Sequence, residues 1–348
     1  MSGSQALRRA AQPAELLELA GGGPGGDRRS LARLLSVAEQ GGAVGRDLAR
    51  LTYPRSGAAY SVGITGAPGA GKSTLTARLI AEALQETGES VAVLAIDPTS
   101  PLSGGAILGD RVRMQEHALN RMVYIRSMAT RGHLGGLAAA VPDAVRVFDA
   151  AGWPLVLVET VGVGQVEVEV AASCDTVVVV LNPGWGDAVQ ANKAGLLEVA
   201  DVLVINKADR PGVRETKRDL VHMLQLSHDL EWMPPIVETV ASSGDGIHDL
   251  WAALSAHRAH LESAGGLDRR RTARLVEETE RLAAARLAAG VAEELHGSSS
   301  TLIDELAARR INPAEAADRI VIEVAGSLMR QDRSEAPAGD PSADLGSA

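Results

Sequence analysis

The sequence predicts an α/β fold, in which a doubly wound, mostly parallel sheet is preceded by a helical layer and followed by a helical extension. Six continuous apolar runs alternate with helical patterns, as is typical of parallel strands that are buried on both faces. The runs lie at residues 61–65, 91–96, 155–158, 177–181, 202–205 and 236–240. Polar residues directly follow several runs, so we expect a functional site at the carboxyl ends of the strands.

Both ends of the chain have helical patterns. Residues 14–19 and 28–39 form two of them, with Leu31, Leu34 and Leu35 at helical spacing. After residue 267 the strands stop, and helical patterns cover residues 268–295, 301–309 and 314–330. The run of Arg269, Arg270 and Arg271 is interpreted as the solvated start of a helix. We therefore expect an N-terminal helical segment (1–57), an α/β domain (58–266), a C-terminal helical arm (267–331) and a disordered tail (332–348).

Composition excludes several classes of protein. The 348 residues carry a net charge of −10 and very few aromatic residues, which argues against a nucleic-acid or membrane-surface partner. The single cysteine, Cys174, excludes a disulfide framework and a cysteine-built zinc site. Because the sequence has neither a secretory signal pattern nor an apolar run long enough to span a membrane, we expect a cytoplasmic protein.

A glycine-rich stretch follows the first apolar run and fits the phosphate-loop pattern G-x-x-x-x-G-K-[ST]. Glycines allow consecutive backbone N–H groups to turn inward toward phosphate oxygens. Lys72 is expected to reach the β- and γ-phosphates, and Ser73 to ligate Mg²⁺. The alternative is a chance match to the pattern. The predicted strand before the loop and the predicted helix after it argue against a chance match. The expected nucleotide-binding residues here are Gly66, Ala67, Pro68, Gly69, Ala70, Gly71, Lys72, Ser73 and Thr74.

A second motif, Asn206-Lys207-Ala208-Asp209, follows a later strand and has the guanine-reading N-K-x-D pattern. The Asp209 carboxylate can accept from guanine N1–H and its exocyclic amine, and adenine has no matching pair of donors. A helix-capping aspartate would also explain Asp209. Val240, Ala241 and Ser242 lie where a base-backing loop is expected, with the Ala241 N–H as a donor to the guanine oxygen.

A third motif begins at a strand end with Glu159. Glu159 is expected to hold Mg²⁺ through water, and Gly162 to sense the γ-phosphate through its N–H group. Gln165 is either a residue that orients water or one that stabilises the loop.

With these motifs, the chain resembles the G proteins associated with methylmalonyl-CoA mutase, the MeaB-like family that is also labelled ArgK. The resemblance covers roughly residues 14–330. Segments that carry it are residues 66–74, 97–100, 104–110, 126, 131–136, 159–165, 206–209 and 312–313.

The resemblance implies a homodimeric GTPase that binds GTP, GDP and Mg²⁺. It implies a chaperone that gates adenosylcobalamin loading of a cobalamin-dependent acyl-CoA mutase and protects or reactivates it, with the adenosyltransferase as a further partner. Residues that the resemblance assigns to Mg²⁺ or to switches are Asp97, Asp110, Glu159, Asp187, Gln190 and Lys193.

Other interpretations stay open for several of these residues and for the function. Asp97 could cap its strand, Asp110 could form a solvated pair with Arg111, and Gln190 and Lys193 could lie on an exposed helix face. A kinase or transport ATPase is one alternative, which Asp209 disfavours. A metal-delivery GTPase is another alternative, but it would need a Cys/His cluster that this sequence does not have.

Overall fold

A computed structural model gives the structure of the protein. It describes residues 12–97, 114, 117, 119–129, 136–160, 169, 171–184, 198–226, 231–263, 265–296 and 301–335. The chain divides into two compact units, residues 1–274 and 275–348. Among the described helices, none combines the length and the apolar character that are needed to cross a membrane.

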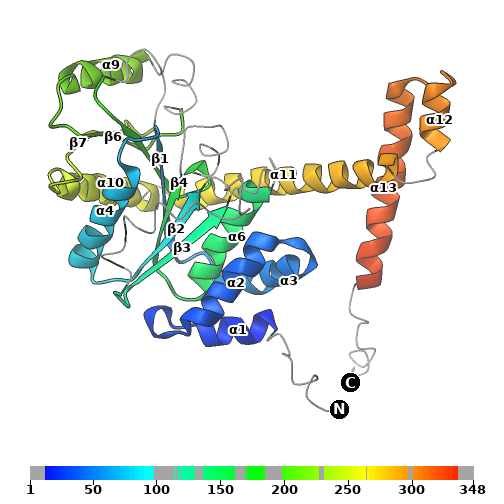
Figure 1. The fold of residues 1–348 in the computed structure, drawn as a ribbon, viewed down its shortest axis with the longest axis horizontal. Helices are drawn as coiled ribbons and strands as arrows, with labels where there is room; N and C mark the ends of the chain where they lie inside the picture. Colours follow the sequence, from blue (N-terminus) through cyan, green and yellow to red (C-terminus); the bar gives the residue numbers. More distant parts are fainter. Residues whose placement is uncertain are drawn as a thin grey trace, which may run out of the picture. The chain divides into compact units, whose positions relative to one another are not determined.

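The first unit contains a seven-stranded sheet in the order β3-β2-β4-β1-β5-β6-β7, and every pair of neighbouring strands is parallel (Figure 1). The strands are β1 (Tyr60–Gly66), β2 (Val91–Asp97), β3 (Val123–Ala129), β4 (Leu155–Thr160), β5 (Thr176–Leu181), β6 (Val202–Asn206) and β7 (Ile236–Thr239). The predicted α/β fold class is confirmed, and so is each of the six strands expected from the apolar runs.

Strand β3 was not expected. Arg126 and Ser127 interrupt its apolar pattern, and β3 is one of the two edge strands of the sheet. Arg126 donates to the Glu39 carboxylate and to the Ser36 hydroxyl, at 3.0 Å each. β3 pairs with β2 along its whole length, and Arg126 also joins it to the helical layer.

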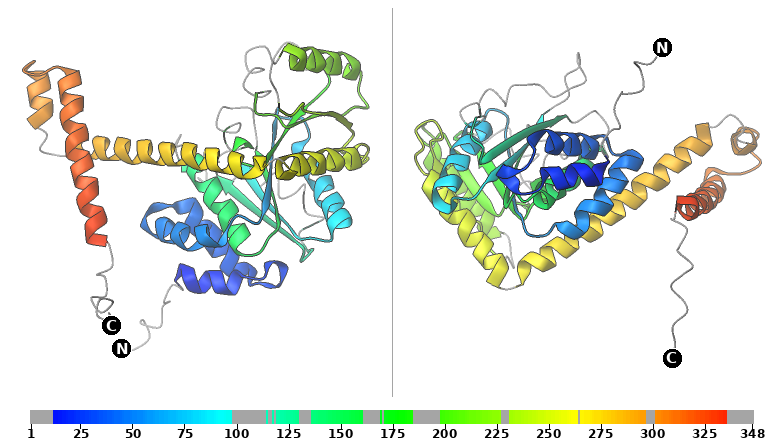
Figure 2. Two further views of the ribbon diagram at one scale, coloured as in Figure 1. Left: turned by 180° about the vertical axis from the view of Figure 1, so that it is seen from behind. Right: turned by 90° about the horizontal axis from the view of Figure 1, so that it is seen from below.

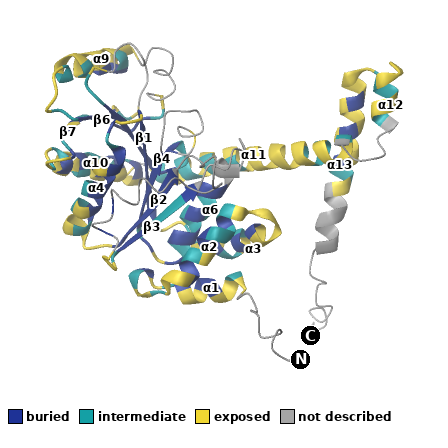
Figure 3. Ribbon diagram, in the orientation of Figure 1, coloured by how far each residue is buried: buried dark blue, intermediate teal, exposed yellow. Residues whose placement is uncertain are grey.

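Helices cover both faces of the sheet, so the sheet is doubly wound (Figure 1). Alternate residues of β2 and β4 pack against α1 (Pro13–Ala20), α2 (Arg28–Gln40), α3 (Gly42–Thr52) and α6 (Gly136–Ala150) on one face. The remaining residues of these strands pack against α4 (Lys72–Thr87) and α10 (Ile247–Ser263) on the other face. Helix α9 (Val213–Leu226) packs on β5 and β6. The central strands are buried along their whole length (Figure 3).

The expected N-terminal helices form a layer against α6. Asp27 caps α2 by accepting from the N–H groups of Arg29 and Ser30, and Leu31, Leu34 and Leu35 are fully buried on its inner face. Helix α3 was not expected. A short 3₁₀ turn, η1 (Gly23–Gly25), lies between α1 and α2, and a second, η2 (Tyr53–Arg55), lies between α3 and β1.

The C-terminal helices are α11 (Gly266–His296), α12 (Thr301–Ala307) and α13 (Pro313–Glu335) (Figure 2). Within the second unit α11 and α13 are in close contact, because a Cβ atom on Gly290 would lie 2.4 Å from Val324 Cγ1. Asn312 caps α13 by accepting from the N–H groups of Ala314 and Glu315. Residues 332–335, expected in a disordered tail, belong to α13, and residues 336–348 lie outside the described part.

Candidate functional site

The glycine-rich stretch forms a loop between the end of β1 and the start of α4. Gly66 has a φ of +139°, and a Cβ atom there would lie 2.0 Å from the Val180 carbonyl oxygen. Gly71 has a φ of +91°, and a Cβ atom there would lie 2.4 Å from Asn206 Nδ2. Both positions therefore require glycine on conformational and on steric grounds. Helix α4 begins at Lys72, so its positive N-terminal end adjoins the loop.

Lys72 lies inside the loop that precedes it. Only 6% of the residue is exposed, and its ammonium group donates to the carbonyl oxygens of Gly66 at 2.7 Å and of Ala67 at 3.0 Å. The charge is thus held over the loop, where an anionic group bound by the loop would meet it.

Ser73, which follows Lys72, contacts Glu159, the first residue of the third sequence motif. The Ser73 hydroxyl donates to Glu159 Oε1 at 2.6 Å, and both residues are buried. Glu159 is the penultimate residue of β4, so the start of α4 and the end of β4 place a hydroxyl and a carboxylate together. These hard oxygen donors are of the kind that Mg²⁺ prefers, and they fit a magnesium site at this edge of the sheet.

The N-K-x-D motif follows β6 and is tied to the phosphate loop. Asn206 donates from Nδ2 to the Ala70 carbonyl at 2.7 Å, and its Oδ1 accepts from the Ala241 N–H and from the Thr239 hydroxyl, both at 3.1 Å. Lys207 has a left-handed backbone with a φ of +60°, and its ammonium group donates to the Gly69 carbonyl. Asn206 thus joins three segments that are far apart in the sequence.

The remaining predicted positions around this motif are also near it. Asp209 is exposed in the turn after β6, where its carboxylate is available to a ligand. Val240 closes the loop after β7 by pairing its backbone with Asp245. Since the Ala241 N–H already donates to Asn206, a guanine oxygen would have to share or replace that bond. Ser242 is exposed beside it.

The other predicted residues either have only their backbone described or lie outside the described part of the structure. The Asp97 backbone ends β2 at the same edge of the sheet as the phosphate loop, and its side chain is outside the described part. Predicted residues outside the described part are Asp110, Gly162, Gln165, Asp187, Gln190 and Lys193.

Sequence reasoning missed Arg78 and Thr239. Arg78 lies on α4 and bonds the carbonyl oxygens of Ala241 and Ser242, and Thr239 bonds Asn206. Neither residue belongs to a motif, so only the contacts identify them.

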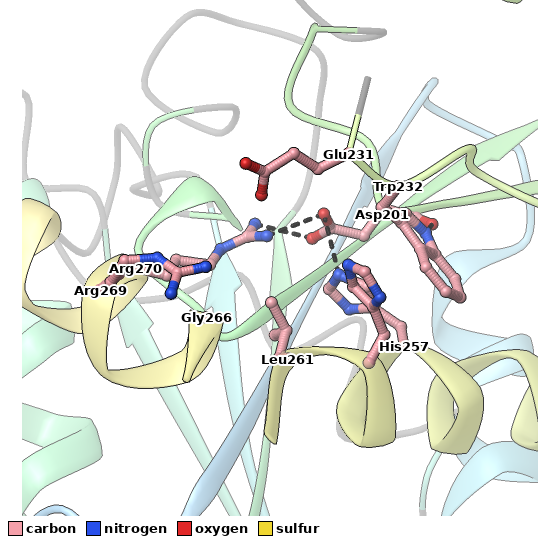
Figure 4. Close-up of a pocket in the computed structure, with 9 residues that line it drawn as sticks. Asp201, Glu231, Trp232, His257, Leu261, Gly266, Arg269 and Arg270 are labelled. Atoms are coloured by element: carbon pink, nitrogen blue, oxygen red, sulfur yellow. Dashed lines mark hydrogen bonds and ion pairs between the residues drawn. The ribbon is translucent and has the colours of Figure 1, made fainter. Parts of the chain in front are cut away.

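A second polar cluster lies at the opposite edge of the sheet, where β5 and β6 begin. It surrounds a cavity of about 290 Å³ (Figure 4). Asp201 receives two hydrogen bonds from the Arg270 guanidinium, at 2.8 and 2.7 Å, and lies 3.4 Å from His257 Nε2. Burial lowers the pKa of His257, and the Asp201 charge partly opposes that shift.

The neighbouring carboxylate, Asp175, is held more tightly. It accepts from Arg271 at 3.0 and 2.8 Å, from Arg274, and from the Ser61 N–H and hydroxyl. The interpretation of the arginine run as a solvated helix start is therefore wrong for Arg270 and Arg271, which are half-buried ion-pair partners.

Comparison with known proteins gives consistent findings. The family model described as Methylmalonyl Co-A mutase-associated GTPase MeaB matches residues 31–296. A relative from Pyrococcus abyssi (strain GE5 / Orsay) is 49% identical over 306 residues, which make up 86% of this chain and 94% of the relative. GTPase ArgK of Escherichia coli (strain K12) is 37% identical over 262 residues, 72% of this chain and 78% of that protein. A crystal structure titled LAO/AO transport system kinase shares 26% identity with a TM-score of 0.65, and the match covers 91% of this chain and 99% of that one.

Proposed function

The chain belongs to the methylmalonyl Co-A mutase-associated GTPase MeaB family, as its motifs predicted, and we propose that it is a Mg²⁺-dependent GTPase chaperone for a cobalamin-dependent acyl-CoA mutase. In this role it gates adenosylcobalamin loading of the mutase and protects or reactivates that enzyme, with an adenosyltransferase as a further partner. The GTPase part follows from the family, and the client enzyme and the cofactor are the proposal.

One observation carries the nucleotide part of the proposal, namely the position of Asn206 between the phosphate loop and the loop after β7. Its amide bonds Ala70 on one side and Ala241 on the other. These contacts support a single site in which Asp209 reads guanine and Lys72 binds the phosphates. Adenine offers the Asp209 carboxylate no matching donors, so the site favours GTP over ATP.

The residues at the phosphate end divide the work of hydrolysis. The backbone N–H groups of the loop and the Lys72 ammonium orient the β- and γ-phosphates and stabilise the charge that grows on them. Mg²⁺, when bound, neutralises charge on the same oxygens. Ser73 and Glu159 are the described residues that would hold it, and we assign Asp97 and Asp110 to the same ion from the family resemblance.

The remaining assignments complete the proposal. Gly162 and Gln165 would respond to the γ-phosphate, and Asp187, Gln190 and Lys193 would carry the contact with the mutase. The helices after residue 267 would form a homodimer. Intrinsic GTP hydrolysis is expected to be slow and to rise when the mutase is added, because a cationic group supplied by a partner can accelerate phosphoryl transfer by orders of magnitude.

The test is GTP hydrolysis with and without the purified methylmalonyl-CoA mutase, for the wild type, Lys193→Ala and the control Lys217→Ala. Lys217 is an exposed lysine of α9. We expect Lys193→Ala to keep basal turnover and GTP affinity and to lose most of the stimulation, and we expect Lys217→Ala to behave as wild type. A wild-type rate that the mutase leaves unchanged would contradict the chaperone role, and equal hydrolysis of ATP and GTP would favour an ATPase.

A further inference from the structure

Arg78 links the helix of the phosphate loop to the turn that follows β7. The side chain extends from α4 and donates from Nε to the Ala241 carbonyl at 3.2 Å and from Nη2 to the Ser242 carbonyl at 3.1 Å. The two acceptors are successive backbone carbonyls. A guanidinium presents several donors in a fixed plane, so it holds both carbonyls with two different nitrogens, whereas a lysine ammonium would have to reach both with a single nitrogen.

Both carbonyls belong to the middle of a tight turn. The Val240 carbonyl accepts from the N–H groups of Ser243 at 3.1 Å and Gly244 at 2.9 Å, which makes Ala241 and Ser242 the central residues. The peptide between the two central residues of a turn has two common orientations, which differ in where its C=O and N–H point. Since C=O and N–H point in opposite directions across a trans peptide, fixing the Ala241 C=O also fixes the Ser242 N–H.

The opposite side of this turn faces the guanine motif. The Ala241 N–H donates to Asn206, which directly precedes Lys207 and lies three residues before Asp209. Asn206 thus holds the turn from the side of the N-K-x-D motif, and Arg78 holds it from the side of α4. Removal of Arg78 would leave the central peptide free to rotate, while Asn206 and the phosphate loop would keep their own contacts.

A nearby polar contact joins α4 to α10, the helix that follows the turn. Glu82 lies four residues after Arg78, on the same face of α4, and its Oε1 is 2.8 Å from His248 Nδ1 on α10. The His248 side chain is 73% exposed, so solvent screens this pair. The two Arg78 bonds, in contrast, end on the turn itself.

We propose that Arg78 is a positioning residue for guanine recognition, which holds the turn of residues 240–243 so that the Ser242 N–H, on the side opposite the Ala241 carbonyl, remains directed toward the base. Arg78 does not touch the nucleotide in this arrangement. The inference rests on the proposed binding of GTP at this site, and it adds a specificity determinant that lies outside the phosphate loop and the N-K-x-D motif.

The experiment measures the dissociation constants of GTP, ATP and tripolyphosphate for the wild type, Arg78→Met and Arg78→Lys. Arg218→Met is the control, because Arg218 lies on α9 with a side chain that is 78% exposed. Two hydrogen bonds from a charged donor fix the turn, so we expect Arg78→Met to weaken GTP binding about tenfold. Binding of ATP and tripolyphosphate should stay within about twofold of wild type, since a loss confined to GTP places the defect at the base-reading turn.

Steady-state kinetics provide a second measurement. Arg78→Met should raise KM for GTP and leave kcat unchanged, and Arg78→Lys should lie between wild type and Arg78→Met, because the ammonium keeps the charge but has no planar pair of donor nitrogens. An unchanged ratio of GTP to ATP affinity in both variants would overturn the inference. An equal loss for GTP, ATP and tripolyphosphate would also overturn it, because it would show a general role in folding α4. A wild-type protein without any preference for GTP would overturn the proposed nucleotide specificity itself.

Discussion

The two edges of the sheet use polar residues in opposite ways. At the carboxyl edge, Lys72 and Asn206 bond backbone carbonyls of the phosphate loop and hold it in shape for a ligand. At the amino edge, Asp175 and Asp201 are bonded to arginines of α11 and serve the protein itself. The same strands, β5 and β6, run between the two edges. Polar groups of one sheet are thus divided between ligand binding and internal attachment.

The amino edge depends on charge pairs that are largely removed from water. Asp175 is 1% exposed, and burial alone would raise its pKa. The hydrogen bond from Arg271 and the charges of Arg274 and Arg271 outweigh burial and lower the pKa to about 2. A buried ion pair contributes little net stability over an apolar pair, but the loss of one partner is costly. From this difference we expect that damage at the amino edge lowers stability and leaves the function at the carboxyl edge intact.

The largest effect is expected from Asp175→Ala. This change leaves Arg271 and Arg274 without their buried carboxylate, and we expect the free energy of unfolding to fall by about 3–5 kcal/mol. Urea unfolding followed by circular dichroism measures it, with the exposed Asp219→Ala of α9 as the control. The folded variant should bind GTP as the wild type does. A strong loss of GTP affinity in fully folded Asp175→Ala would show that the edges are not independent.

The converse change is Lys72→Ala at the carboxyl edge. Loss of the cation that faces the phosphates should lower kcat for GTP by about a hundredfold or more. The free energy of unfolding should change by only about 1 kcal/mol, which is the usual net value of such hydrogen bonds. Phosphate-release assays measure kcat, and urea unfolding of the same samples measures the free energy of unfolding. Lys217→Ala is the control for both. Near-normal hydrolysis in Lys72→Ala would rule out the phosphate-loop assignment.

Asp209→Asn tests the base-reading part of the same edge. A hydrogen bond to a charged group is worth about 1.5–3 kcal/mol, so GTP affinity should fall at least about tenfold, and affinity for xanthosine triphosphate should rise. Because Asp209 is exposed, the unfolding midpoint should not move. Titration with labelled nucleotides measures the affinities of Asp209→Asn and the wild type for GTP and for xanthosine triphosphate. If GTP affinity were the same in Asp209→Asn and wild type, the carboxylate would have only a capping role.

The smallest effect is an acid-dependent loss of stability from the amino edge. The folded pKa of Asp175 lies below its ordinary value of 3.8, so its contribution is present above that value and is lost as the pH falls through about 2. Over this window we expect a loss of about 2 kcal/mol from Asp175. Unfolding curves of the wild type and of Asp175→Asn between these pH values should converge, since the amide does not titrate. Parallel curves would show that another group causes the acid sensitivity.

Much of the fold and of the nucleotide site could be predicted from the sequence because the signals are local. The phosphate loop is nine consecutive residues, and its glycines are required by the backbone that those residues form. The N-K-x-D motif is equally compact. Six strands were found from continuous apolar runs, since burial on both faces leaves a pattern within each strand.

Only the tertiary structure decided what depends on partners far along the chain. Arg78 meets Ala241, Arg126 of the edge strand β3 meets Glu39, and Arg271 meets Asp175. An arginine beside solvent and an arginine beside a buried carboxylate look alike in a sequence, because the side chain is the same and the partner is distant. The sequence by itself therefore determined the fold class and the nucleotide motifs. The tertiary structure decided which charges hold the protein together, because that depends on which distant groups the packed chain brings within hydrogen-bonding distance.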